Sequence, residues 1–278
     1  IQVDSQKFDF VVLGDRRGGG DEEWPVFDRA IEEINLLNPD FVVMVGDLIQ
    51  GYTSDEAEFT AQWEDFWKHA DALKMPLVMV PGNHDVTNEH MLKHWKETYG
   101  RTYYSFDYQK CHFLVLNSQE HDVHGEDCIG QEQVDFAVKD LAKNKKVQHT
   151  FVFVHQPLWL TDKNHAQWAE IEDALGDRPY TVLAGHLHNL ILCVRNDQRY
   201  IVLSSTMGVN VDEPNTAPST GAFPSYAQVT VDGGDVSFAI IEPGNIWSPD
   251  VATEANYRAI DELVKIETTE VTGLNEEI

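Results

Sequence analysis

Six side chains of the kind that bind metal ions stand directly after short apolar runs of the chain. Each has a glycine or a proline close to it in the sequence. The six are Asp15, Asp47, Asn83, His155, His186 and His188. Carboxylate, amide and imidazole donors without a thiolate suit divalent Mn, Fe, Zn, Ni or Co. The pattern therefore predicts a site for divalent metal ions.

The apolar runs before these residues predict β-strands, and the stretches between them have helical spacing. Residues 8–13, 41–45 and 77–80 are rich in Val, Phe, Leu and Met, and they alternate with helical patterns that include Trp24 and Trp63. This order favours a parallel sheet covered by helices. Ligands collect at the carboxyl ends of strands in such sheets, so we expect the six side chains to meet at one edge.

In the middle of the chain, two predicted strands are joined by a short turn rather than by a helix. Residues 102–108 and 111–117 predict a hairpin. Further strands are expected at 150–154, 180–184, 190–194, 200–204, 226–231 and 236–241, with helices at 130–143 and 168–175. Residues 206–225 have no period and predict a long loop of the kind that often carries function. We expect a catalytic domain over residues 1–242 and a helical extension of the same domain over 243–278.

The order of the motifs and the residues in them resemble the signature of the calcineurin-like metallophosphoesterase superfamily. They read Asp15, Gly46-Asp47, Gly82-Asn83-His84-Asp85, His155 and Gly185-His186-Leu187-His188. The resemblance extends over about residues 8–241. It implies an α/β (α+β) fold, a four-layer αββα sandwich of two mixed β-sheets flanked by helices. It also implies an enzyme that hydrolyses phosphoesters with divalent metal ions.

The resemblance further implies a role for each residue of the motifs. It assigns the ligands of two ions, which share one residue: Asp15, Asp47 and His188 for the first, and Asp47, Asn83, His155 and His186 for the second. A hydroxide bridging the two ions is then the nucleophile, because metals lower the pKa of bound water. His84 protonates the leaving oxygen or holds the phosphate. Phosphomonoesters and phosphodiesters are both compatible with this arrangement.

The first motif departs from the family pattern, which is commonly Asp-x-His. The chain has Arg17 where that histidine would stand. Purple acid phosphatases supply a tyrosine three residues after the bridging aspartate, but that position is Gln50 here, and Tyr52 is two residues farther on. We therefore expect three protein ligands at the first position, completed by water or Gln50. We expect Arg17 to pair with the substrate phosphate, the alternative being a surface carboxylate.

The charge of the chain limits the partners that it can have. Lys and Arg number 20 against 47 Asp and Glu, which gives a formal net charge of −27. Such a chain repels nucleic-acid backbones, so we expect no nucleic acid bound by a basic face. No apolar run is long enough for a membrane span. A small phosphorylated substrate is the expected partner, and the sequence does not define the oligomeric state.

Other features of the sequence leave alternatives open. A catalytically silent interaction module that keeps the fold is the second functional hypothesis, based on the missing histidine at position 17. His90 and His94 favour a solvated helix face over a zinc pair, and residues 119–128 favour a polar surface loop. The three cysteines fit one disulfide or three thiols. The chain begins at Ile1, which indicates either an exported protein without its leader or a trimmed sequence.

Overall fold

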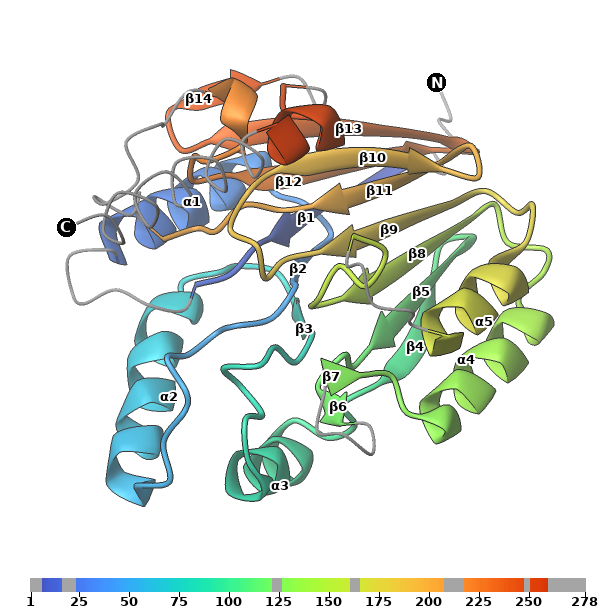
Figure 1. Cartoon of the computed structure of the whole chain (residues 1–278). Helices are drawn as coiled ribbons and strands as arrows, with labels where there is room; N and C mark the ends of the chain where they lie inside the picture. The colour runs from blue at the N-terminus through green and yellow to red at the C-terminus, as the bar shows by residue number, and fades with distance from the viewer. Residues whose placement is uncertain are drawn as a thin grey trace, which may run out of the picture.

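The chain forms four layers, with two β-sheets packed face to face and helices on their outer faces (Figure 1). The computed structural model describes residues 7–16, 24–121, 127–160, 166–207, 218–247 and 251–259. The two large sheets have six strands each. This arrangement confirms the αββα sandwich that the resemblance to the family implies.

The first sheet contains the two ends of the chain's β-structure. Its order is β14-β13-β12-β1-β2-β3. The strands are β1 (Lys7–Leu13), β2 (Phe41–Met44), β3 (Leu77–Met79), β12 (Tyr226–Asp232), β13 (Asp235–Glu242) and β14 (Asn245–Trp247). The helices on its outer face are α1 (Trp24–Leu37), α2 (Glu56–Ala70) and α3 (Glu89–Thr98).

The second sheet is formed by the middle of the chain. Its order is β10-β11-β9-β8-β5-β4. The strands are β4 (Tyr104–Tyr108), β5 (Cys111–Leu116), β8 (His149–Val154), β9 (Tyr180–Ala184), β10 (Ile191–Arg195) and β11 (Gln198–Val202). Helices α4 (Gln131–Lys143) and α5 (Ala166–Leu175) cover its outer face. The short strands β6 (Glu120–His121) and β7 (Asp127–Cys128) pair with each other, and a 3-10 turn spans Pro218–Thr220.

The continuous apolar runs of the sequence follow from this layering. In β1, Phe10 and Val12 face the other sheet, whereas Val11 and Leu13 pack against the outer helices. A strand buried on both faces needs apolar residues at every position rather than at alternate positions. Between the sheets, the ring of Phe10 meets that of Phe151 edge-on at a centroid distance of 4.9 Å.

The pairing of the strands brings the predicted site residues to one edge of the sandwich. In the first sheet, β1, β2 and β3 run parallel. In the second sheet, β5, β8 and β9 run parallel as well. Parallel strands end at the same edge, so the turns that follow β1, β2, β3, β8 and β9 gather there. Val45 and His155 join the two sheets at this edge, since the His155 ring contacts the Val45 carbonyl.

The segment after β5 differs from the surface loop expected over 119–128. Gln119 is only 8% exposed, so this expectation is wrong for the start of the segment. The Glu120 carboxylate accepts hydrogen bonds from the backbone N–H of Gly130, at 2.6 Å, and from Gln133 Nε2, at 2.9 Å. Gly130 precedes α4, and a carboxylate is favourable at a helix N-terminus, which explains why the chain turns inward here.

The sequence allows one disulfide or three thiols and has no apolar run long enough for a membrane span. Cys111 and Cys193 are buried free thiols. Among the described helices, none combines the length and the apolar character that crossing a membrane requires.

Candidate metal centre and active site

Asp15 and Asp47 lie side by side in the turns after β1 and β2. Both side chains are almost fully buried. The backbone N–H of Arg16 donates to the Asp47 carbonyl at 2.9 Å, which ties the two turns together. Buried carboxylates that lie close together repel each other unless cations compensate their charge.

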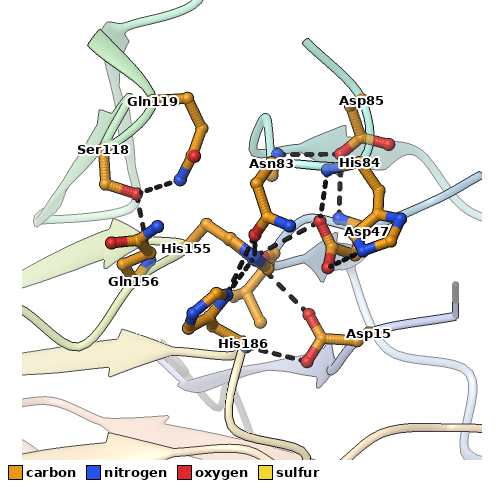
Figure 2. A network of polar contacts seen from close by, with 12 residues as sticks. Asp15, Asp47, Asn83, His84, Asp85, Ser118, Gln119, His155, Gln156 and His186 are labelled. Atoms are coloured by element: carbon orange, nitrogen blue, oxygen red, sulfur yellow. Dashed lines mark hydrogen bonds and ion pairs between the residues drawn. The ribbon is translucent and has the colours of Figure 1, made fainter. Parts of the chain in front are cut away.

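Three donor atoms converge beside the carboxylate of Asp47 (Figure 2). Asn83 Oδ1 lies 2.9 Å from both His155 Nε2 and His186 Nδ1. His155 Nε2 also lies 3.2 Å from Asp47 Oδ1. The other ring nitrogen of His155, Nδ1, lies 2.8 Å from the Val45 carbonyl, so it carries the proton and leaves Nε2 for a metal ion.

A second group of donors adjoins the first. His188 Nε2 lies 3.7 Å from Asp15 Oδ2. One donor atom from each of Asp15, Asp47 and His188 lies within 4.8 Å of the others, and the same is true of Asp47, His155 and His186. Asp47 belongs to both groups. Two clusters of oxygen and nitrogen donors that share a carboxylate fit a pair of divalent cations.

Three of these residues adopt a left-handed backbone conformation. The φ angles are +55° at Asp47, +72° at His186 and +56° at His188. Asp and His tolerate this region better than most residues, but each such residue still costs about 1–3 kcal/mol. Strain of this kind clusters at functional sites, and here it points three ligand-type side chains at one place.

The glycines of the motifs allow the close approach of backbone and side chains. A Cβ at Gly82 would lie 2.2 Å from Asp47 Oδ1, and a Cβ at Gly46 would lie 2.4 Å from His155 Nδ1. Atoms cannot approach this closely without displacement. Packing therefore requires the glycine of the Gly-Asp motif and the glycine of the Gly-Asn-His motif, in addition to the chemistry of the residues that follow them.

His84 lies at the edge of the cluster and is 5% exposed. Its Nδ1 donates to the Gln50 carbonyl, and its Nε2 lies 3.9 Å from Asp47 Oδ2. The side chain of Gln50 is exposed, so this residue orients His84 through its backbone carbonyl. This contact places the other ring nitrogen, Nε2, on the side of the ring that faces Asp47.

The charges of the cluster act on one another. Burial alone raises the pKa of Asp47, but the charges and hydrogen bonds of His155 and His84 hold it below its ordinary value. Burial alone lowers the pKa of His155, but the Asp47 and Asp15 carboxylates and the Val45 carbonyl raise it to about 10. A cation bound at this position would therefore compete with a proton for His155 Nε2.

Asp85 is a residue of the site that the sequence analysis did not select. Its carboxylate is fully buried and accepts backbone N–H groups from both turns that frame the cluster. Asp47, Leu48 and Gly82 each donate to it at 2.8 Å. Burial, and then the charge of Asp47, raise its pKa to about 7, whereas these N–H groups act in the opposite direction. Its position as the last residue of the Gly-Asn-His-Asp motif was the only sequence signal.

Arg17 lies outside the described residues. Its neighbour Arg16 is 4% exposed, and the Arg16 guanidinium carbon lies 3.4 Å from the centre of the Trp24 ring. Trp24 in turn stacks on His69 at 3.9 Å. Arg16 and Trp24 are the described residues on either side of positions 17–23 in the sequence, and the stack joins these two side chains.

The chain belongs to the calcineurin-like phosphoesterase family, whose model matches residues 8–190. It is 37% identical over 160 residues to the mouse serine/threonine-protein phosphatase CPPED1. The matched region covers 53% of this chain and 51% of that protein. The chain thus spans about half the length of this relative. It is 25% identical over 198 residues to the 3',5'-cyclic adenosine monophosphate phosphodiesterase CpdA of Escherichia coli K12, covering 67% of this chain and 69% of that protein.

The likeness extends to solved structures. A dimetal phosphatase from Danio rerio superposes with a TM-score of 0.60 over 84% of this chain and 98% of its own, at 14% sequence identity. At this identity the likeness shows the fold alone, and it agrees with the four layers described above.

Proposed function

We propose that the chain is a metal-dependent phosphoester hydrolase with two adjacent divalent ions. The observation that carries this proposal is the pair of donor groups that share Asp47. Asp15, Asp47 and His188 would hold the first ion, and Asp47, Asn83, His155 and His186 would hold the second. Mn, Fe, Zn, Ni and Co all accept this set of donors. When bound, such a pair of ions supplies a water that is nucleophilic near neutral pH and neutralises charge on the phosphoryl oxygens.

His84 is the general acid that donates a proton to the leaving group in this proposal. Its Nδ1 is fixed on the Gln50 carbonyl, so its Nε2 faces the side of the site that Asp47 lines. A protonated Nε2 donates to the leaving oxygen or to a phosphoryl oxygen. A silent interaction module would not need an imidazole buried and oriented in this way.

The substrate is a small phosphorylated molecule. The net charge of −27 repels anions at long range, so a local cation has to attract the phosphate. Arg17 has this role in the proposal, because guanidinium groups bind phosphate oxygens in pairs. The relatives are named as a phosphatase and a phosphodiesterase, which supports both phosphomonoesters and phosphodiesters as substrates.

A panel of nitrophenyl monoesters and diesters, assayed with Mn, Ni and Zn, tests this function. We expect metal-dependent hydrolysis that falls by about 10²–10⁴-fold in His84→Asn, the range of general acid catalysis. Asp47→Asn is expected to lose both metal and activity. His90→Gln, at a half-buried histidine of α3 that pairs with Glu56 and lies outside both donor groups, is the matched control and is expected to keep both. Absence of metal binding and of turnover in the wild-type protein would instead favour the interaction module.

A further inference from the structure

Tyr52 contacts two residues of the candidate active site at once. Asn83 Nδ2 donates to the Tyr52 hydroxyl at 3.0 Å. The Tyr52 ring meets the His84 imidazole edge-on, with the ring centres 4.6 Å apart and an angle of 81° between the planes. Tyr52 is separated from Asn83 by 31 residues in the sequence.

The turn that carries Tyr52 is anchored to two helices. The N–H of Gly51 donates to Gln62 Oε1 on α2 at 2.7 Å, and the Thr53 carbonyl accepts Asn88 Nδ2, at the start of α3, at 3.0 Å. Tyr52 itself has a φ of +52°, which an unsupported tyrosine rarely adopts. The side chain is 58% exposed, yet the backbone holds it in place.

The carboxamide of Asn83 needs such a support. Its oxygen lies between His155 and His186, at 2.9 Å from a nitrogen of each. Only this oxygen can bind a cation, because the other end of the group is an N–H₂ donor. A carboxamide that is free to rotate would present its oxygen to the ion for only part of the time. The Tyr52 hydroxyl accepts a hydrogen bond from the N–H₂ end of the Asn83 carboxamide, and this bond restrains its rotation.

We infer that Tyr52 is a positioning residue that aims Asn83 Oδ1 at the second metal position and so sets the affinity of that position. The inference rests on the proposed function, since it assumes that an ion binds between Asn83, His155 and His186. The hydroxyl acts through Asn83, whereas the ring supports His84. These two contacts can be separated by mutation.

Tyr52→Phe removes the hydroxyl and keeps the ring. Calorimetric titration of the metal-free protein with Mn²⁺ is expected to show binding weakened by about 10–100-fold at one position, as for other residues that orient a metal ligand. We expect excess Mn²⁺ to restore kcat, because His84 keeps its ring contact. Tyr52→Ala is expected to keep a lowered kcat even at saturating Mn²⁺. Tyr103→Phe, at a tyrosine outside the site, is the control and is expected to bind Mn²⁺ like the wild type.

A double-mutant cycle shows whether Tyr52 acts through Asn83. In the background of Asn83→Ala, adding Tyr52→Phe is expected to cause no further loss of Mn²⁺ affinity. Equal losses in both backgrounds, or unchanged affinity in Tyr52→Phe alone, would overturn the inference. A wild-type protein that binds no Mn²⁺ would refute the proposed function itself. Normal wild-type binding with an unaffected Tyr52→Phe would refute only the role of Tyr52.

Discussion

The carboxylate of Asp85 holds the backbone of Asp47 in place. Asp85 Oδ2 accepts the N–H of Asp47 and the N–H of Gly82, both at 2.8 Å. These two N–H groups belong to the turns after β2 and β3. One buried carboxylate therefore sets the distance between the residue shared by both donor groups and the loop that presents Asn83 and His84.

Asp85→Asn is expected to damage both stability and the metal centre. The new amide group would face backbone N–H donors and leave buried groups without an acceptor. We expect a loss of about 2–4 kcal/mol in the free energy of unfolding, measured with urea on metal-free protein, and weaker Mn²⁺ binding. Asp177→Asn, on the exposed surface, should change neither quantity. Full stability of Asp85→Asn would show that the carboxylate does not hold the two turns.

Gly82→Ala tests the packing of the same two turns. The added methyl group would lie 2.2 Å from Asp47 Oδ1 and 2.4 Å from the backbone nitrogen of Asp47, so the turns have to move apart. We expect destabilisation of about 1–3 kcal/mol together with loss of metal binding. Gly234→Ala is the matched control, because its methyl group would meet no atom within 4 Å. Equal behaviour of the two variants in thermal unfolding and Mn²⁺ titration would contradict this description of the turns.

His149, far along β8 from the site, is expected to make stability depend on pH. Burial, and then the charge of Arg199, lower its pKa from 6.5 to about 4. The folded protein thus keeps the ring neutral where the unfolded chain binds a proton. The stabilisation is complete above pH 6.5 and is lost progressively as the pH falls from 6.5 to about 4.

The contribution of His149 can be isolated with the variant His149→Gln. Between pH 7 and pH 5, we expect the wild type to lose about 2 kcal/mol more unfolding free energy than the variant does. Urea denaturation at several pH values measures this difference. Parallel pH profiles for the two proteins would show that His149 titrates normally in the folded state.

The strand ends of the site were predictable from the sequence, but several of the contacts between side chains were not. Val- and Phe-rich runs followed by Asp47 or His155 carry a local signal, and parallel pairing brings their ends together. Tyr52 carries no such signal. Its contact with Asn83 depends on two successive left-handed residues, Gly51 and Tyr52, and on hydrogen bonds to helices elsewhere in the chain.

His112 gives a second example outside the site. The sequence places it in an apolar strand and predicts a packing or surface residue. In the fold it is 1% exposed and lies between two carboxylates, at 2.7 Å from Asp107 and 2.8 Å from Asp140. Asp107 lies on β4, the partner of β5 in the predicted hairpin, whereas Asp140 lies on α4, whose position beside β5 follows only from the packing of the layers.

The most direct test of the metal centre is anomalous X-ray diffraction from crystals of the wild-type protein soaked in Mn²⁺. We expect two peaks about 3.5–4 Å apart, with a carboxylate oxygen of Asp47 between them and Asn83 Oδ1 next to the second. A single peak, or two peaks that Asp47 does not connect, would contradict this expectation.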